Sequence, residues 1–444
     1  MIFTTKNISL ELSDATGGIV SCKVMGREIC KEIGTKPSLF MIKLLEQKGN
    51  AMYFTSLNAK KTEITKTESG AQLKYTDIGG FKISVCATLT VCDEELRWSV
   101  SLDNNTEFIA EWIEFPQIVV IDSFKAEGGE FELFWPVCEG IVIDNKKIRN
   151  SKWMGYKEIG GMSAGYCGYF PGPCNMQYMA YYNGKEGLYF GSHDKDMNPK
   201  TIEYREENGG IALEKRLFLN GAQGHFESNY DVVMSGFAGD WQEAAEIYRT
   251  WADKNANRPI KLRDRKDLPE WLGEAPVIML YPIRGTKDHG DMTPNMYYPY
   301  ANALPIAKDF SEKMASKIMA LPMHWEGTAP WATPYVWPPY GGEEEFKSFV
   351  DELHAQGNLA GVYCSGIGWT TKSFLDPTLD FSAKYDESLM CRTPKGTIEQ
   401  SKIIGEPIRL GYDMCPESDK VGEIVSGEVM SIAESGCDYA QYFD

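Results

Sequence analysis

The feature that most constrains the fold is an alternation of strand-like and helix-like segments between Glu274 and Asp444. Continuous apolar runs begin at Val277, directly after Lys317, and at Leu359, as expected for strands that are buried on both faces of a parallel sheet. The segments between these runs carry apolar residues at the three- and four-residue spacing of an amphipathic helix. Repeated strand–helix units predict a parallel sheet with helical connections.

The same pattern gives the approximate bounds of these elements. We expect helices over 303–314, 343–356 and 421–432, and a further strand over the last residues, 437–444. Between the third strand and the third of these helices, residues 365–415 show no clear periodicity and are predicted to form a long loop.

Two architectures fit this order of elements, an open doubly wound sheet and a (β/α) barrel. A nucleotide-binding sheet usually has a glycine-rich turn after its first strand. Here the first strand runs into the segment Tyr281-Pro-Ile-Arg-Gly, which is not such a fingerprint. We therefore predict an incomplete (β/α)8 TIM-type barrel, with residues 274–444 as its first half.

Residues 1–235 show a different periodicity. Segments such as Lys82–Val91 and Leu96–Leu102 alternate apolar and polar residues, which is typical of half-buried strands. Turn residues separate them, and Asn183-Gly184 predicts a hairpin with a type I′ turn. Many short antiparallel strands predict a large β-sandwich, so the expected fold class is multidomain, β followed by α/β.

A short helical and polar stretch, residues 236–273, links these two parts. Asp240 and Glu243 resemble a capping box at the start of a helix. The polar segment that follows the helix contains prolines and is expected to be a connector.

The composition excludes several functions. The formal net charge of −18 disfavours nucleic acids and anionic membrane surfaces as partners. The N-terminus has no signal-peptide pattern and no apolar run is long enough to span a bilayer, so a cytoplasmic location is expected. The 11 cysteines include no C-x-x-C pair, and no cofactor or metal is expected.

Catalytic groups in a barrel lie at the carboxyl ends of the strands. The residues at these ends are rich in aromatic rings, carboxylates and other polar groups: Arg284 after the first strand, His324, Trp325, Glu326 and Trp337 after the second, Tyr363, Ser365 and Trp369 after the third, and Tyr442 and Asp444 in the fourth. Aromatic rings can stack on the apolar faces of sugars, while carboxylates and His bind their hydroxyl groups. This set predicts a carbohydrate site, although the tryptophans could instead pack the loops together.

Glycoside hydrolysis requires two carboxyl groups. Asp444 ends an apolar strand and is the first candidate, with Glu326 as the second. Position alone also allows a terminal Asp that has no chemical role. His324 could bind a sugar hydroxyl or be a core residue that forms its own hydrogen bonds.

Four segments also resemble a known family: H-W-E-G at 324–327, W-P-P-Y-G-G-E-E-E-F at 337–346, G-V-Y-C-S-G-I-G-W at 361–369 and D-Y-A-Q-Y-F-D at 438–444. They resemble an uncharacterised family of bacterial glycoside-hydrolase-like proteins, which is distantly similar to the retaining α-galactosidase group. The resemblance implies a galactose-mutarotase-like supersandwich before the barrel. It implies Asp444 as the nucleophile, with Tyr442 where that group has lysine, and a general acid from the sixth strand.

The resulting hypothesis is a glycoside hydrolase that acts on an α-linked sugar such as a galactoside, with a retaining mechanism. A chain with four barrel strands would lack its general acid, so a second copy or a C-terminal segment would have to complete it. The alternatives are a non-catalytic carbohydrate-binding or truncated structural relative, and a sugar epimerase or lyase.

Overall fold

The computed structural model describes residues 1–31, 36–46, 50–145, 168–255, 260–285, 292–328, 332–374, 376, 378–393, 395–398, 400–401 and 409–442. The chain divides into two compact units, Met1–Pro259 and Ile260–Asp444, which we call the N-terminal and C-terminal units. The division into 1–235, 236–273 and 274–444 stays a prediction. Among the helices described, none is long and apolar enough to cross a membrane.

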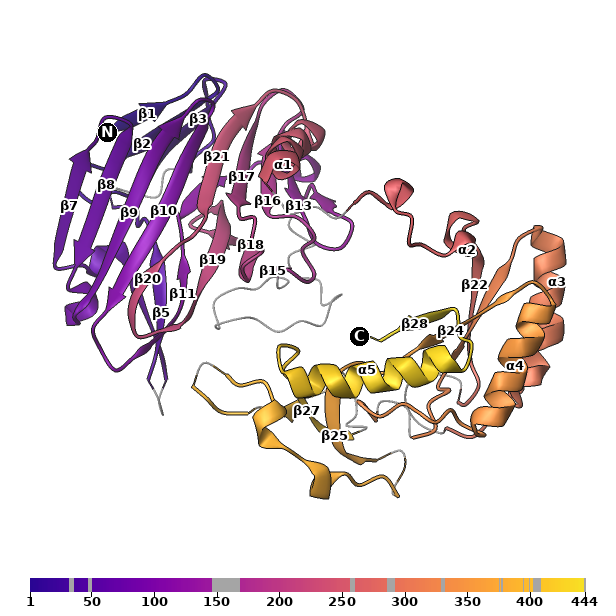
Figure 1. Ribbon diagram of the computed structural model, residues 1–444. Helices are drawn as coiled ribbons and strands as arrows, with labels where there is room; N and C mark the ends of the chain where they lie inside the picture. The colour runs from indigo at the N-terminus through magenta and orange to yellow at the C-terminus, as the bar shows by residue number, and fades with distance from the viewer. Residues whose placement is uncertain are drawn as a thin grey trace. The chain divides into compact units, whose positions relative to one another are not determined.

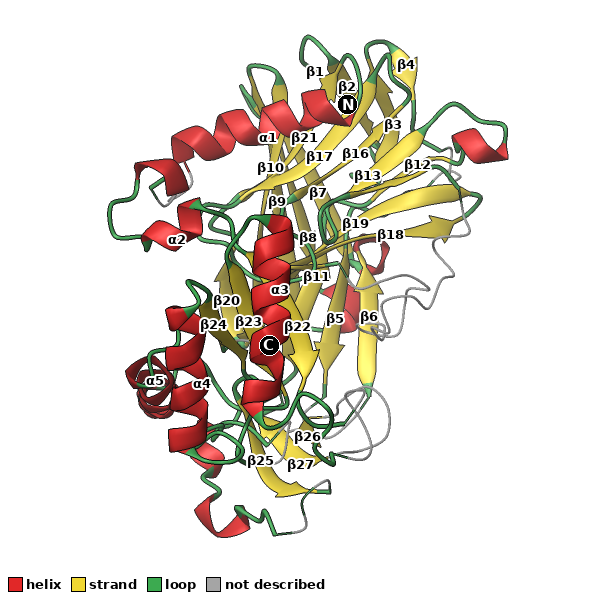
Figure 2. Ribbon diagram, turned by 90° about the vertical axis from the view of Figure 1, so that its right-hand side faces the viewer, coloured by secondary structure: helices red, strands yellow, loops and turns green. Residues whose placement is uncertain are grey.

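Antiparallel sheets build the N-terminal unit (Figures 1 and 2). A four-stranded sheet contains β1 (Ile2–Thr4), β2 (Ile8–Leu12), β3 (Ile19–Val24) and β4 (Arg27–Glu28). A ten-stranded sheet contains, in spatial order, β14 (Ile141–Ile143), β13 (Glu132–Trp135), β16 (Tyr178–Tyr182), β17 (Gly187–His193), β21 (Asp231–Phe237), β10 (Glu95–Asn104), β9 (Ile83–Cys92), β8 (Gly70–Thr76) and β7 (Lys61–Lys66), with β20 (Gly224–Glu227) beside β10. A seven-stranded sheet contains β15 (Tyr169–Phe170), β18 (Lys200–Glu207), β19 (Gly210–Ala222), β11 (Ile109–Glu114), β5 (Met41–Leu45) and β6 (Ala51–Thr55), with β12 (Ile118–Ile121) beside β19.

One apolar core joins these three sheets. Leu10 on β2, Ile42 on β5 and Val85 on β9 are all buried in it. Their strands follow the period-two pattern, so every second side chain points into this core. The predicted β-sandwich is therefore observed.

The hairpin at Asn183-Gly184 forms between β16 and β17, but its turn is not the predicted one. A type I′ turn requires a positive φ at both central residues. Gly184 has a φ of 83°, whereas Asn183 is not in the positive-φ region. The loop runs over four residues instead, and the Asn183 side chain accepts hydrogen bonds from the N–H groups of Lys185 and Glu186 at 2.9 and 3.0 Å.

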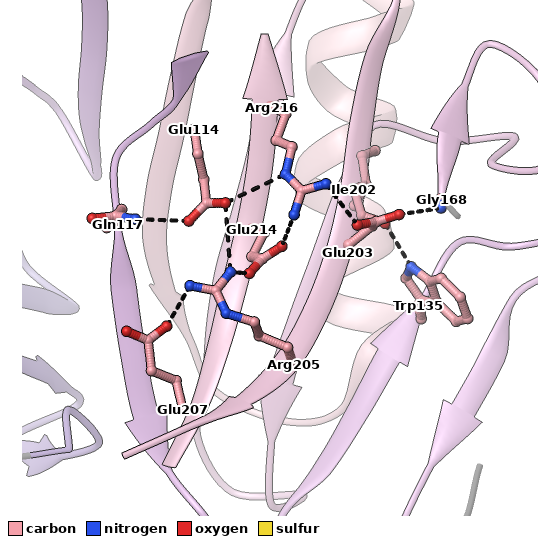
Figure 3. Close-up of polar contacts among 10 residues, drawn as sticks. All are labelled: Glu114, Gln117, Trp135, Gly168, Ile202, Glu203, Arg205, Glu207, Glu214 and Arg216. Atoms are coloured by element: carbon pink, nitrogen blue, oxygen red, sulfur yellow. Dashed lines mark hydrogen bonds and ion pairs between the residues drawn. The ribbon is translucent and has the colours of Figure 1, made fainter. Parts of the chain in front are cut away.

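The seven-stranded sheet also differs from a simple sandwich, because polar side chains on one of its faces are buried (Figure 3). Arg216 on β19 is 0% exposed and pairs with Glu114 on β11 at 3.4 Å. It also pairs with Glu203 on β18 at 3.4 Å and with Glu214 at 3.0 Å. Arg205 joins the same carboxylates from β18.

Alternation of apolar and polar residues predicts that this face meets solvent, and the structure shows a paired ionic layer instead. Burying a charge costs several kcal/mol unless it is paired and hydrogen-bonded. Each residue of this layer comes from one of three neighbouring strands, so a shift in strand register would leave buried charges without partners. The layer therefore favours one register of β11, β19 and β18.

Helix α1 (Trp241–Asn255) begins at the predicted capping box. The N–H of Asp240 donates to Glu243 at 2.8 Å, and Asp240 accepts from the N–H of Gln242 at 2.8 Å. The helix packs Ala244 against an aromatic cluster that includes Tyr178 of the ten-stranded sheet.

The C-terminal unit contains the predicted parallel sheet. Its strand order follows the chain: β22 (Val277–Pro282), β23 (Ile318–Met323), β24 (Leu359–Tyr363) and β28 (Tyr439–Gln441). Three helices connect them: α3 (Leu304–Met314), α4 (Glu343–Ala355) and α5 (Asp419–Glu434). Closure into a barrel is not seen among the described strands, so the TIM-type barrel stays a prediction.

One apolar core lies between this sheet and its helices. Ala307 of α3, Phe349 of α4 and Val425 of α5 are buried with Ala320 and Val362 of the sheet. Figure 1 shows α3 and α4 side by side. The remaining short helices are α2 (Glu270–Gly273), η1 (Ser56–Asn58), η2 (Ile78–Gly80), η3 (Lys125–Glu127), η5 (Leu262–Asp264), η6 (Tyr300–Ala303), η7 (Ser382–Lys384) and η8 (Glu387–Leu389).

The prediction of a loop over 365–415 is wrong. This segment contains a small antiparallel sheet of β25 (Gly368–Ser373), β27 (Arg409–Asp413) and β26 (Gln400–Ser401). A bulge between Thr370 and Lys372 shifts the register of β25 against β27. It interrupts the period-two pattern by one residue, which is why the pattern was not visible.

Candidate functional site

The Glu326 side chain is buried near the C-terminal ends of the parallel strands. It follows β23 and is 3% exposed. Its Oε1 accepts a hydrogen bond from the N–H of Ser365 at 2.9 Å and another from the Ser365 hydroxyl. Burial raises the pKa of Glu326 to about 7, although the Ser365 bonds and the charge of Arg284 oppose this rise. Near neutral pH this carboxyl group can therefore either hold or accept a proton.

Arg284 fixes the backbone around this carboxyl group. Its Nε donates to the carbonyl of His324 at 2.9 Å, and its Nη2 donates to the carbonyl of Glu326 at 2.5 Å. The guanidinium also lies over the ring of Tyr340 at 4.2 Å. Burial lowers the pKa of Arg284, and the charge of Glu326 opposes that effect. Two parallel donors on one rigid group set the direction of the chain from β23 into the site.

His324 adopts a strained conformation at this point. Its φ is 58°, in the left-handed region that residues other than glycine seldom adopt. The Nδ1 of His324 donates to the carbonyl of Arg284 at 2.8 Å, so each of these residues bonds the backbone of the other. Such strain persists only where the surrounding structure holds it, and it is found most often at functional sites.

The aromatic residues predicted at the strand ends divide into two groups. Trp325 is 0% exposed, stacks on Phe346 and donates its indole N–H to the carbonyl of Tyr363 at 2.7 Å. Trp369 and Tyr442 are also buried, and the Tyr442 hydroxyl donates to the carbonyl of Pro334.

These three rings pack the loops together, which is the alternative that the sequence left open. Trp337 and Tyr363 are partly exposed. The Trp337 indole N–H donates to Glu343 at 3.0 Å. Of the predicted aromatic contacts, Trp337 and Tyr363 thus keep surface that a ligand could reach.

Glu428 on α5 was missed by the sequence reasoning. Its Oε2 accepts the N–H groups of Val336 and Trp337, each at 2.8 Å, and so holds the loop that carries Trp337. The signal was present, because Glu428 lies seven residues after Val421, on the apolar stripe of the helix. A carboxylate on such a stripe requires a partner.

The structure thus brings together Arg284, His324 and Glu326 from two strand ends, and Ser365 from a third. Asp444, the predicted nucleophile, lies outside the described residues. Among the residues that the structure describes, no group of three His, Cys, Asp or Glu side chains could hold a metal ion. The described site thus holds a buried carboxyl group with a pKa raised to about 7.

Comparison with known proteins agrees with this architecture. Residues 226–419 match a protein-family model described as a domain of unknown function, DUF6259. None of the curated proteins matches the chain. The fold is similar to that of alpha-N-acetylgalactosaminidase NagBb from Bifidobacterium bifidum in complex with Gal-NHAc-DNJ, with a TM-score of 0.70, 15% identity, and coverage of 100% of this chain and 69% of that chain.

The ligand-free structure of NagBb gives a TM-score of 0.67 at 15% identity, over 99% of this chain and 70% of that chain. GH36 alpha-galactosidase AgaA from Geobacillus stearothermophilus gives a TM-score of 0.43 at 11% identity, over 100% of this chain and 65% of that chain. The expected resemblance is confirmed: the chain matches the model of an uncharacterised family and is distantly similar to solved glycosidase structures. The fold is that of a multidomain protein with a β-sandwich, similar to a glycosidase structure.

Proposed function

We propose that this chain is part of a glycoside hydrolase that acts on an α-linked sugar. The observation that carries the proposal is the buried carboxyl group of Glu326, whose pKa is raised to about 7. It accepts hydrogen bonds from Ser365, while the backbone carbonyl of Glu326 accepts from Arg284. Near-neutral carboxyl groups suit proton exchange with sugar oxygens. The fold of NagBb, whose name describes an α-N-acetylgalactosaminidase, supports the same class of reaction.

The parallel sheet is the first half of a (β/α)8 barrel in this proposal. Ile278 and Leu280 on β22 are 59% and 61% exposed, on the face opposite the helices. Their partners on β23, Met319 and Leu321, are apolar as well and are buried. An apolar face suits the inner surface of a barrel, in which further strands would cover the exposed side chains of β22. A segment that follows Asp444, or a second copy of the chain, would supply those strands.

The roles follow from the strand ends. Asp444 is proposed as the nucleophile of a retaining mechanism, on the basis of the family resemblance. Glu326 binds a sugar hydroxyl, donating when protonated and accepting when ionised. Trp337 and Tyr363 line the sugar, and His324 and Arg284 position the loop that carries Glu326. The general acid is expected on the strands that complete the barrel.

The test is hydrolysis of aryl α-D-galactosides and aryl N-acetyl-α-D-galactosaminides by the protein as its gene encodes it, with any segment that follows Asp444. Asp444→Asn should lower kcat by at least about 10³-fold, since it removes the covalent step. Turnover that survives this substitution would refute the nucleophile assignment. Saturable sugar binding without any turnover would support the carbohydrate-binding alternative instead.

A further inference from the structure

A cavity lies entirely within the N-terminal unit. Its volume is about 400 Å³, and its walls come from β10, β17 and α1. The residues that line it include Glu95, Arg97, His193, Trp251 and Lys254. A volume of this size falls within the range of small-molecule sites.

One wall of the cavity is aromatic. The imidazole of His193 and the indole of Trp251 stack at 4.8 Å with an angle of 10° between their planes. The Tyr189 hydroxyl lies 3.3 Å from Nε2 of His193. Burial, followed by the charges of Arg97 and Lys215, lowers the pKa of His193 to about 3, so this ring is neutral near pH 7. The stacked rings of His193 and Trp251, with the Tyr189 hydroxyl beside His193, form a rigid apolar surface.

The neighbouring wall is polar, and Oε2 of Glu95 lies 3.9 Å from Nδ1 of His193. Nε and Nη2 of Arg97 bind Oε2 of Glu95 at 2.9 and 2.8 Å. A guanidinium has five N–H donors and a carboxylate accepts about four hydrogen bonds, so both groups retain capacity for a ligand. The Glu95 side chain is 19% exposed and that of Arg97 is 42% exposed, so each reaches the solvent-filled space.

The charges of the lining decide the ligand class. Three carboxylates, of Glu94, Glu95 and Glu246, and two positive groups, of Arg97 and Lys254, line the cavity, so both signs are present. An anion would meet three carboxylates, and a cation would meet two positive groups. A neutral polyhydroxyl compound can instead donate to the carboxylates and accept from the guanidinium while one face stacks on the indole.

We propose that this cavity binds a neutral saccharide of one or two pyranose rings. All its lining residues belong to the N-terminal unit, and the proposal does not depend on the proposed hydrolysis. Trp251 supplies the stacking surface, and the Glu95–Arg97 pair recognises neighbouring hydroxyl groups.

The experiment is saturation-transfer NMR and titration calorimetry of the full chain with D-galactose, N-acetyl-D-galactosamine and D-glucose, and with inorganic phosphate as an anionic probe. At least one of the sugars should bind with a Kd of about 1 mM or tighter. Trp251→Ala and Arg97→Gln should each weaken that binding at least about 10-fold, as loss of one stacking or charged contact does. Trp241→Ala is the matched control, because Trp241 lies on the same helix but stacks on Phe134 outside the cavity.

Each other outcome overturns the proposal. The proposal is wrong when none of the three sugars binds saturably, or when phosphate alone binds. It is equally wrong when Trp251→Ala and Arg97→Gln both leave sugar binding intact while Glu326→Gln removes it. The sugar would then bind at the strand ends of the C-terminal unit. Arg97→Gln keeps the test valid should Trp251→Ala fail to fold.

Discussion

Glu326→Gln should change how the stability of the protein depends on pH. The pKa of this carboxyl group is raised from 4.5 to about 7 in the folded protein, so the folded state binds the proton more tightly than the unfolded chain. Stability from this group is therefore complete below pH 4.5 and is lost as the pH rises through about 7. At about 1.36 kcal/mol for each pKa unit, the loss amounts to about 3 kcal/mol.

Glutamine keeps an oxygen that can accept both Ser365 bonds but does not ionise. The variant should gain about 3 kcal/mol relative to the parent protein between pH 4.5 and pH 8. Urea unfolding followed by tryptophan fluorescence at several pH values measures this difference. Glu352→Gln, on the exposed side of α4, is the control and should show no such trend. A parent–variant difference that stays constant over this pH range would refute the reasoning.

Three further outcomes are expected. Arg284→Lys should lose the paired bonds to the backbone and destabilise the protein by about 2–4 kcal/mol, measured as a lower unfolding midpoint; an unchanged midpoint contradicts the positioning role. Glu428→Gln should reduce hydrogen-exchange protection of the N–H groups of Val336 and Trp337, and equal protection would show that the carboxylate does not hold this loop. The pKa of His193 is lowered from 6.5 to about 3, so the stability contributed by its neutral ring is lost as the pH falls below 6.5. His193→Gln should therefore reduce the loss of folding stability between pH 6.5 and pH 3. An unchanged loss of stability over this range would argue against a neutral buried ring.

The sequence predicted the order of elements in the C-terminal unit because each buried strand is a continuous apolar run. The helix predicted over 343–356 is observed as Glu343–Ala355, and the strand predicted from Leu359 begins there. Each of these helices and strands buries one or both faces, so its apolar residues recur in a regular pattern along the sequence. The strands of 365–415 are short, and β25 carries a bulge, so they leave no such period.

The candidate site was predicted in part. Arg284, His324 and Glu326 could be placed because they directly follow predicted strands. The burial of Trp325 could not be foreseen, because it depends on a carbonyl of Tyr363, 38 residues away, that satisfies the indole N–H. The Glu428 contact depends likewise on a loop 91 and 92 residues earlier in the chain. Pairings at such distances are set by tertiary packing rather than by local spacing.

The exposed apolar side chains of β22 have a practical consequence for handling the protein. This strand forms one end of the parallel sheet, and its sequence, Val277–Pro282, contains no charged side chain. Natural edge strands usually carry Lys or another charge that blocks pairing with a neighbouring molecule. Preparations of these 444 residues should therefore self-associate as concentration rises, and Leu280→Lys should restore monodispersity in light scattering.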